Sequence, residues 1–288
     1  MSRLNAGPMM ETFAFDVGAI RCIAVHDGEM PYRAEDYVAN AGSLEVTKAL
    51  AQHGHRPDAI PSPYSGLLLQ TDERVILVDT GAGNLSPNVG HLAANLRDAG
   101  IAPEVIDTVV LTHAHPDHIG GNADDAGQAA FPEARYVLWR DEWAWWTDEA
   151  NLAPMAPVFG EWVRRNLVPL ADHVDLLEHE VDLAPGVHVL ATPGHTEGHL
   201  AISVVSAGQE LLYISDAALH PIHLEHPDWH PVWDQDRERA AASKRKLFDH
   251  AATSGALVLA FHFPPFPSLG HVERHGKGWH WEPIGIQS

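Results

Sequence analysis

The chain has 288 residues and a formal net charge of −21 with its 21 histidines counted as neutral, and 45% of its residues are hydrophobic. This length fits one large domain or two small ones, and the strong negative charge disfavours binding to nucleic acid or to an anionic membrane. No apolar run approaches the roughly 18 residues of a membrane-spanning helix, and the N-terminus lacks the apolar segment of a signal peptide. Cys22 is the only cysteine, which excludes an intramolecular disulfide and agrees with the cytoplasmic location that we expect.

The first half of the chain contains mostly strand patterns. Alternating or short apolar runs predict strands at 12–17, 19–26, 66–70, 74–78, 108–111 and 134–138. Asp27-Gly28 predicts a turn after the second of these strands. Helical patterns lie at 43–52, where Ser43 is the expected N-cap, and at 91–99, 141–149 and 158–166.

The second half continues with several strands up to about residue 215, a helix over 237–253 and a strand at 257–261. Residues 264–288 are rich in loop-forming residues. Strands, helices and strands in this order fit two sheets packed face to face with helices outside, an αββα sandwich of the α/β class. We expect a single domain over 1–288, with its core motifs in about 65–270.

The segment His113-Ala-His115-Pro-Asp117-His118 is the most informative stretch of the sequence. Residues two apart on an extended segment point the same way, so His113 and His115 can bind one metal ion. Asp117 and His118 follow Pro116, where the chain must turn, and can face a second ion. These ligand types suit zinc, and mixed nitrogen and oxygen sets also suit iron or manganese. A histidine-rich surface loop is the alternative explanation.

Other polar residues follow strand-like runs along the chain. In chain order these strand ends carry Asp79, the histidine segment, His195 after a Gly/Pro turn, Asp216 and His262. This order resembles the metallo-β-lactamase superfamily over about residues 65–270. Residues 263–272 and 276–279 further resemble the branch of methyl parathion hydrolase and lactonase-like enzymes.

The resemblance implies a ligand set and a mechanism. The implied metal ligands are His113, His115 and His195 for the first ion, Asp117, His118 and His262 for the second, and Asp216 as the bridge between both. Two divalent ions, with zinc expected and iron or manganese possible, would hold a shared hydroxide that attacks an ester or lactone carbonyl. Asp117 would also act catalytically as a proton carrier. Asp79 and His199 would support the ligands rather than bind an ion, with a simple turn role as the alternative for Asp79.

The expected substrate pocket departs from one branch of the superfamily. Acyl-homoserine lactonases carry a substrate-binding tyrosine three residues after the bridging aspartate, and this chain has Leu219 there. Acyl-homoserine lactones are therefore not the expected preferred substrates, and His220 is the candidate replacement for the missing donor. We expect the pocket to be lined by Leu219, His220, Phe261, Phe263 and Phe266, with core packing as the alternative for the three phenylalanines.

The leading prediction is a metal-dependent hydrolase of a small-molecule ester or lactone. The alternatives are a phosphotriesterase of the parathion-hydrolase type, a glyoxalase-type thioesterase, and a non-catalytic metal-binding protein on the same fold. Arg274 and Lys277 are too sparse for the cationic patch that a glutathione thioester would need. A non-catalytic relative would be expected to have lost metal ligands, and no ligand position is missing in this chain. The family resemblance also implies a homodimer.

Overall fold

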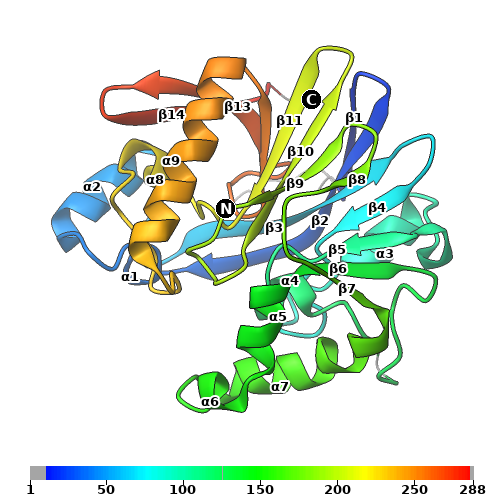
Figure 1. The fold of residues 1–288 in the computed structure, drawn as a ribbon. Helices are drawn as coiled ribbons and strands as arrows, with labels where there is room; N and C mark the ends of the chain where they lie inside the picture. The colour runs from blue at the N-terminus through cyan, green and yellow to red at the C-terminus, as the bar shows by residue number, and fades with distance from the viewer. Residues whose placement is uncertain (1–10, 125, 286–288) are drawn as a thin grey trace, which may run out of the picture.

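Two β-sheets of seven strands each pack face to face in the computed structural model, which describes residues 11–124 and 126–285 (Figure 1). Helices cover the outer faces of both sheets, which confirms the αββα sandwich.

The first sheet contains its strands in chain order. They are β1 (Thr12–Val17), β2 (Ile20–Tyr32), β3 (Ile60–Gln70), β4 (Val75–Val78), β5 (Thr108–Val110), β6 (Arg135–Trp139) and β7 (Val174–Leu177). Pairing is antiparallel from β1 to β4 and parallel from β4 to β7. The carboxyl ends of β4 and β5 therefore lie at the same edge of this sheet.

The second sheet also contains consecutive strands. They are β8 (Asp182–Ala184), β9 (Val187–Ala191), β10 (Leu200–Ser206), β11 (Gln209–Ser215), β12 (Leu257–Ala260), β13 (Leu269–His275) and β14 (Gly278–Pro283). β11 and β12 are parallel, and the other neighbours are antiparallel. The parallel pair again brings two strand ends together.

The helices fall into groups that cover different parts of the sandwich. They are α1 (Ala34–Tyr37), α2 (Ser43–Gln52), α3 (Leu92–Asp98), α4 (Pro116–Ile119), α5 (Arg140–Thr147), α6 (Glu149–Leu152), α7 (Pro157–Asn166), α8 (Ile222–Glu225) and α9 (Arg237–Ser254). Helices α3 and α5 to α7 pack on the first sheet, α9 packs on the second, and α1, α2 and α8 share a smaller apolar cluster. Within the described ranges, no helix combines the length and the apolar character that crossing a membrane requires.

Strand alternation divides the apolar core into layers. Leu67 and Leu69 of β3 belong to the cluster between the two sheets, whereas Leu68 belongs to the cluster beneath the helices of the first sheet. Successive side chains of a strand point to opposite faces, so a continuous apolar run in β3 serves both layers. The long helix α9 has Asp236 as its N-cap residue, and the side chain of Asp236 accepts a hydrogen bond from the Arg239 amide at 3.0 Å.

Residues 27 and 28 lie inside β2, so the predicted turn there is wrong. The register of β2 against β3 shifts between His26 and Gly28, which marks a bulge. Asp27 accepts hydrogen bonds from three backbone amides of the segment 82–92 at 2.8 to 3.0 Å. Gly28 has a φ of +122°, and a Cβ there would lie 2.1 Å from the Asn88 carbonyl oxygen, so only glycine fits this close approach.

Strand β3 starts six residues earlier than the expected start at residue 66. Pro61 and Pro63 pair with Pro31 and Glu29 of β2. On its other side β3 pairs with β4, and this pairing covers only residues 67–70 of β3. Pro61 and Pro63 therefore lie in a part of β3 that has no strand partner on that side. Proline is tolerated at such an edge because no amide hydrogen is needed there.

The C-terminal stretch forms a hairpin rather than loops alone, which corrects the expectation for residues 264–285, while residues 286–288 lie outside the described residues. β13 and β14 pair across a tight turn, and Trp279 and Trp281 are buried on one face while His280 is exposed on the other. The prolines of 264–267 lie just before β13 and favour loops. The strand alternation that follows them was therefore not predicted.

Candidate metal centre

Five segments bring polar side chains to one edge of the sandwich. Parallel pairing puts the carboxyl ends of neighbouring strands at the same edge, where ligand sites of α/β sheets form. Asp79 follows β4, residues 113–118 follow β5 and enter α4, His195 lies between β9 and β10, Asp216 follows β11, and His262 follows β12.

The first group of side chains consists of three buried imidazoles and one oxygen of Asp216. The Nδ1 atom of His115 lies 2.9 Å from Nε2 of His113 and 3.0 Å from Nε2 of His195. Nε2 of His195 lies 3.2 Å from Oδ2 of Asp216. These four ligand atoms all lie within 4.8 Å of one another, a spacing that suits a single metal ion.

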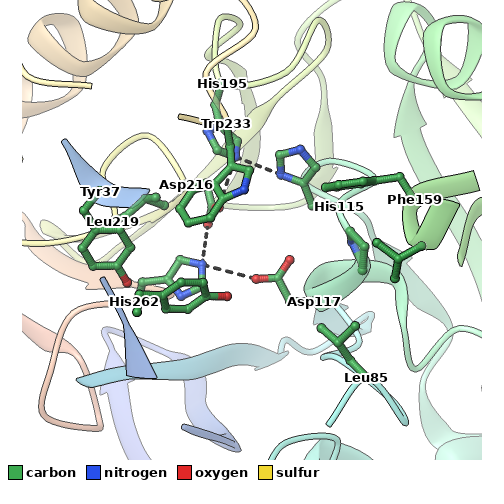
Figure 2. Close-up of a pocket in the computed structure, with 13 residues that line it drawn as sticks. Tyr37, Leu85, His115, Asp117, Phe159, His195, Asp216, Leu219, Trp233 and His262 are labelled. Carbon is green, nitrogen blue, oxygen red and sulfur yellow. Dashed lines mark hydrogen bonds and ion pairs between the residues drawn. The ribbon is translucent and has the colours of Figure 1, made fainter. Parts of the chain in front are cut away.

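The second group contains Asp117, His118 and His262, and it faces the other oxygen of Asp216. Figure 2 shows Asp117, His262 and Asp216 of this arrangement. Nε2 of His262 lies 3.4 Å from Oδ2 of Asp117 and 3.5 Å from Oδ1 of Asp216. Nε2 of His118 lies 3.3 Å from the same Asp216 oxygen. Asp216 therefore directs one oxygen to each group, as a bridging carboxylate would.

The chemistry of this cluster fits divalent cations. Among the described residues, Nε2 of His118 and Oδ1 of Asp216 find no hydrogen-bond partner although both are buried. Such an arrangement costs about 1–3 kcal/mol per group unless another species satisfies it. Burial lowers the pKa of His115 to about 3, so this imidazole is neutral and can donate its lone pair. Burial lowers the pKa of His195, but the carboxylates of Asp216 and Asp234 outweigh this effect and raise the pKa to about 9. The environment of His195 therefore favours positive charge.

Asp79 contacts the second group, where the sequence predicted a supporting residue. Its Oδ2 atom accepts a hydrogen bond from Nδ1 of His118 at 2.9 Å, which leaves Nε2 of that imidazole to face the centre. The carboxylate also accepts hydrogen bonds from Thr112 and from the hydroxyl of Tyr213. Asp79 has a φ of +60°, a strained conformation for a non-glycine residue that these contacts hold in place.

Two further supporting residues were not singled out from the sequence. Nδ1 of His195 donates to Oδ1 of Asp234 at 2.9 Å, and Nδ1 of His262 lies 2.9 Å from the hydroxyl of Ser62. Both contacts orient the imidazole so that Nε2 faces the centre. Asp234 lies 39 residues and Ser62 lies 200 residues from its partner in the sequence, so no local spacing pointed to either.

His199 lies outside both ligand groups and supports Asp216 through the backbone. Its Nε2 atom accepts a hydrogen bond from the amide of Asp216 at 3.1 Å, and its Nδ1 atom lies 2.9 Å from the hydroxyl of Thr192. Because Nε2 accepts a hydrogen bond, the ring proton must be on Nδ1, so His199 is held as one neutral tautomer.

Glu142 of α5 joins two of the ligand-bearing loops, and the sequence offered no signal for it. Its buried carboxylate accepts hydrogen bonds from the amides of Ala114 at 2.9 Å and Gly198 at 2.8 Å, and from the indole of Trp146 at 2.7 Å. Ala114 lies between two ligands, and Gly198 lies three residues after His195. One side chain therefore fixes the relative position of both loops.

A cavity of about 220 Å³ opens onto the cluster (Figure 2). The residues that line it are Tyr32, Tyr37, Leu85, His115, Pro116, Asp117, Val158, Phe159, His195, Asp216, Leu219, Trp233 and His262. Leu219 lies in the wall, as expected, and most of the other non-ligand residues are aromatic or aliphatic.

The three phenylalanines that were expected in the pocket lie elsewhere, which corrects that prediction. Phe261 stacks on His118 at 4.0 Å in the core between the sheets, and Phe263 contacts Trp281 on the side of α9. Neighbouring side chains on an extended segment alternate, so with His262 facing the cavity, Phe261 and Phe263 must point away. Phe266 packs against His26 with ring centroids 4.8 Å apart, also outside the cavity wall.

His220 is also absent from the wall of this cavity, so it does not replace the missing donor. It is fully buried, its Nε2 atom lies 2.9 Å from Nδ1 of His55, and its Nδ1 atom accepts a hydrogen bond from the amide of Ile222. Both ring nitrogens are therefore engaged, and the side chain has no free group to offer a substrate.

Removing the carboxylate of Asp234 is expected to weaken metal binding. Asp234→Ala frees the imidazole of His195 to rotate and to change tautomer, so metal affinity should fall about 10- to 100-fold. Competition with a chromophoric chelator measures this affinity. Asp234→Asn keeps an oxygen acceptor and should retain most of the affinity, and an Asp234→Ala protein with unchanged affinity would refute this role.

Comparisons with known proteins agree with the geometry. The chain is 32% identical over 187 residues to a probable metallo-hydrolase of Mycobacterium tuberculosis, which covers 54% of this chain and 56% of that protein. The chain thus spans little more than half the length of this relative. It is 29% identical over 202 residues to an N-acyl homoserine lactonase of Bacillus cereus, covering 62% of this chain and 73% of the lactonase.

A solved structure with the same fold is AidC, described as a dizinc quorum-quenching lactonase in complex with a product. It superposes with a TM-score of 0.87 at 24% identity and covers 96% of this chain and 98% of its own. The sequence profile of the metallo-beta-lactamase superfamily matches residues 59–247, which is more than half of the chain. The match contains six of the seven clustered residues, and the chain belongs to the metallo-beta-lactamase superfamily.

Proposed function

We propose that this chain is a dinuclear metal-dependent hydrolase of neutral esters and lactones. The observation that carries the proposal is the placement of Asp216. This residue lies at the wall of a cavity, and each of its two carboxylate oxygens faces one of the two histidine groups. Carboxylate-bridged pairs of cations are a recurrent arrangement in enzymes that activate water.

The seven clustered residues would hold two cations, with zinc expected from the histidine-rich ligand set. When bound, such cations supply Lewis acidity and lower the pKa of water toward neutrality. Asp117 lines the cavity with 14% of its side chain exposed, against 4% for Asp216. Because Asp117 reaches the cavity, it can accept a proton from the attacking water and pass it to the leaving alcohol.

The cavity wall favours a neutral, compact substrate. Among the described residues that line it, none is lysine or arginine, and Phe159, Trp233 and Leu219 present apolar surface. An anionic substrate such as a glutathione thioester would find no lysine or arginine there to bind its carboxylates, so the wall gives the thioesterase alternative no support. A volume of about 220 Å³ suits an aryl or short acyl group rather than a long chain.

A phosphotriesterase is the second candidate, because a neutral triester meets the same requirements. Its phosphoryl oxygen would take the place of the carbonyl oxygen, and an aryl leaving group would pack on the apolar wall. A single-domain organisation over 1–288, a cytoplasmic location and a homodimer remain predictions, and sedimentation at micromolar concentration tests the dimer.

A panel of lactones, aryl esters, phosphotriesters and thioesters tests the proposal on protein of measured metal content. We expect aryl lactone or ester hydrolysis that chelation lowers at least about a hundredfold and that zinc restores. An aryl lactone should exceed a long-chain acyl-homoserine lactone in kcat/KM. A tenfold preference for the homoserine lactone would show that the inference from Leu219 is wrong, and a fully loaded protein that is inactive on the whole panel would refute the proposed function.

A further inference from the structure

Tyr32, near the end of β2, places a phenol in the cavity beside the metal centre. Its ring meets Trp233 edge-on at 5.4 Å and His262 edge-on at 6.4 Å, and it stacks on Tyr37 at 5.5 Å. Contacts on several sides hold the ring in one orientation. The phenol is therefore positioned, although the chain contributes it from a segment far from all the ligand motifs.

The hydrogen-bond pattern determines where the proton of Tyr32 can point. The hydroxyls of Tyr32 and Tyr64 lie 2.5 Å apart, so one proton lies between them. Tyr64 is fully buried, and among the described residues its hydroxyl has no other partner. If Tyr32 donated, the proton of Tyr64 would be buried without an acceptor, which is costly. Tyr64 therefore donates to Tyr32, and the proton of Tyr32 is free to point into the cavity.

Most other side chains of the wall cannot supply this donor. Leu219 is apolar, and Tyr37 donates its proton to the hydroxyl of Ser62 at 2.7 Å. Among the described side chains of the wall outside the ligand set, the half-buried indole of Trp233 is the one competing donor. Burial, followed by the charge of Asp117, raises the pKa of Tyr32 above its usual value, so the phenol keeps its proton at working pH.

We propose that the hydroxyl of Tyr32, oriented by Tyr64, donates a hydrogen bond to the carbonyl oxygen of the bound substrate. This inference rests on the proposed function, because it assigns the donor for the same site. A hydrogen bond that strengthens as charge develops on that oxygen lowers the barrier as well as improving binding. Tyr32 would thus select substrates with a strong acceptor at the reacting carbon.

A binding experiment tests the donor without relying on turnover. The probe is δ-valerolactam labelled with ¹³C at its carbonyl, bound to metal-loaded protein and observed by difference infrared spectroscopy. Tyr32→Phe keeps the ring but removes the donor, so the carbonyl stretch should move to higher frequency than in the wild type. Trp233→Phe should leave the stretch unchanged. An unchanged stretch in Tyr32→Phe, or a shift in Trp233→Phe alone, would overturn the proposal.

Kinetics on a hydrolysed lactone provide the second test. Tyr32→Phe should lower kcat/KM at least tenfold for the oxygen lactone and much less for the matching thionolactone, because a thiocarbonyl sulfur is a weak acceptor. Equal losses for both would indicate a merely structural role and contradict the proposal. If the loaded wild type hydrolyses nothing on the panel, the proposed function fails, while the infrared result still decides whether Tyr32 donates.

Discussion

Replacing Asp216 with alanine is expected to remove at least one metal ion per chain and to lower kcat/KM by at least about a thousandfold. The carboxylate lies 3.2 Å from Nε2 of His195 through one oxygen and 3.3 Å from Nε2 of His118 through the other. Its loss leaves both sites one ligand short at once. Elemental analysis of gently purified protein, together with rates on the best ester of the panel, measures both effects.

The Asp216 experiment needs controls for folding and for charge. Asp58→Ala removes an exposed carboxylate that pairs with Arg56, and it should leave metal content and activity unchanged. Asp216→Asn keeps one good oxygen ligand and should retain more metal than Asp216→Ala. Two tightly held ions in folded Asp216→Ala would contradict the bridging role.

Replacing Glu142 with alanine is expected to reduce the free energy of unfolding by about 3–5 kcal/mol and to weaken metal binding as well. The carboxylate is buried and accepts from the amides of Ala114 and Gly198 and from the indole of Trp146. Without it, three buried donors lose their partner. The two loops that carry His115 and His195 then lose their common attachment, so the metal site loosens together with the fold.

Urea unfolding of the metal-free protein measures the stability part of this prediction, and chelator competition measures the metal part. Glu142→Gln keeps one carbonyl acceptor and should cost less than Glu142→Ala. Trp146→Phe removes only the indole donor and provides a matched control for the contacts with the loops. A stability of Glu142→Ala within about 0.5 kcal/mol of the wild type would contradict the role assigned to Glu142.

Part of the cluster could be predicted from the sequence because four of its seven residues are close neighbours along the chain. His113, His115, Asp117 and His118 lie within six residues after a strand, and their chemical types alone indicate a metal. The αββα layers were also predictable, because the apolar periodicity of each segment reports which face is buried. Strand alternation alone also predicts that Phe261 and Phe263 point away from the side on which His262 lies.

Only the tertiary structure decided which distant residues support and line the centre. Ser62 meets His262 across 200 residues of chain, and Asp234 reaches His195 across 39. Glu142 and Tyr32 likewise acquire their roles by packing, and nothing in the residues around them in the sequence marks them. Such contacts depend on strand register and on how the two sheets face each other, and these are properties of the whole fold. The sequence thus determined which atoms can bind a metal, and the fold determined which groups orient those atoms and which groups would face a substrate.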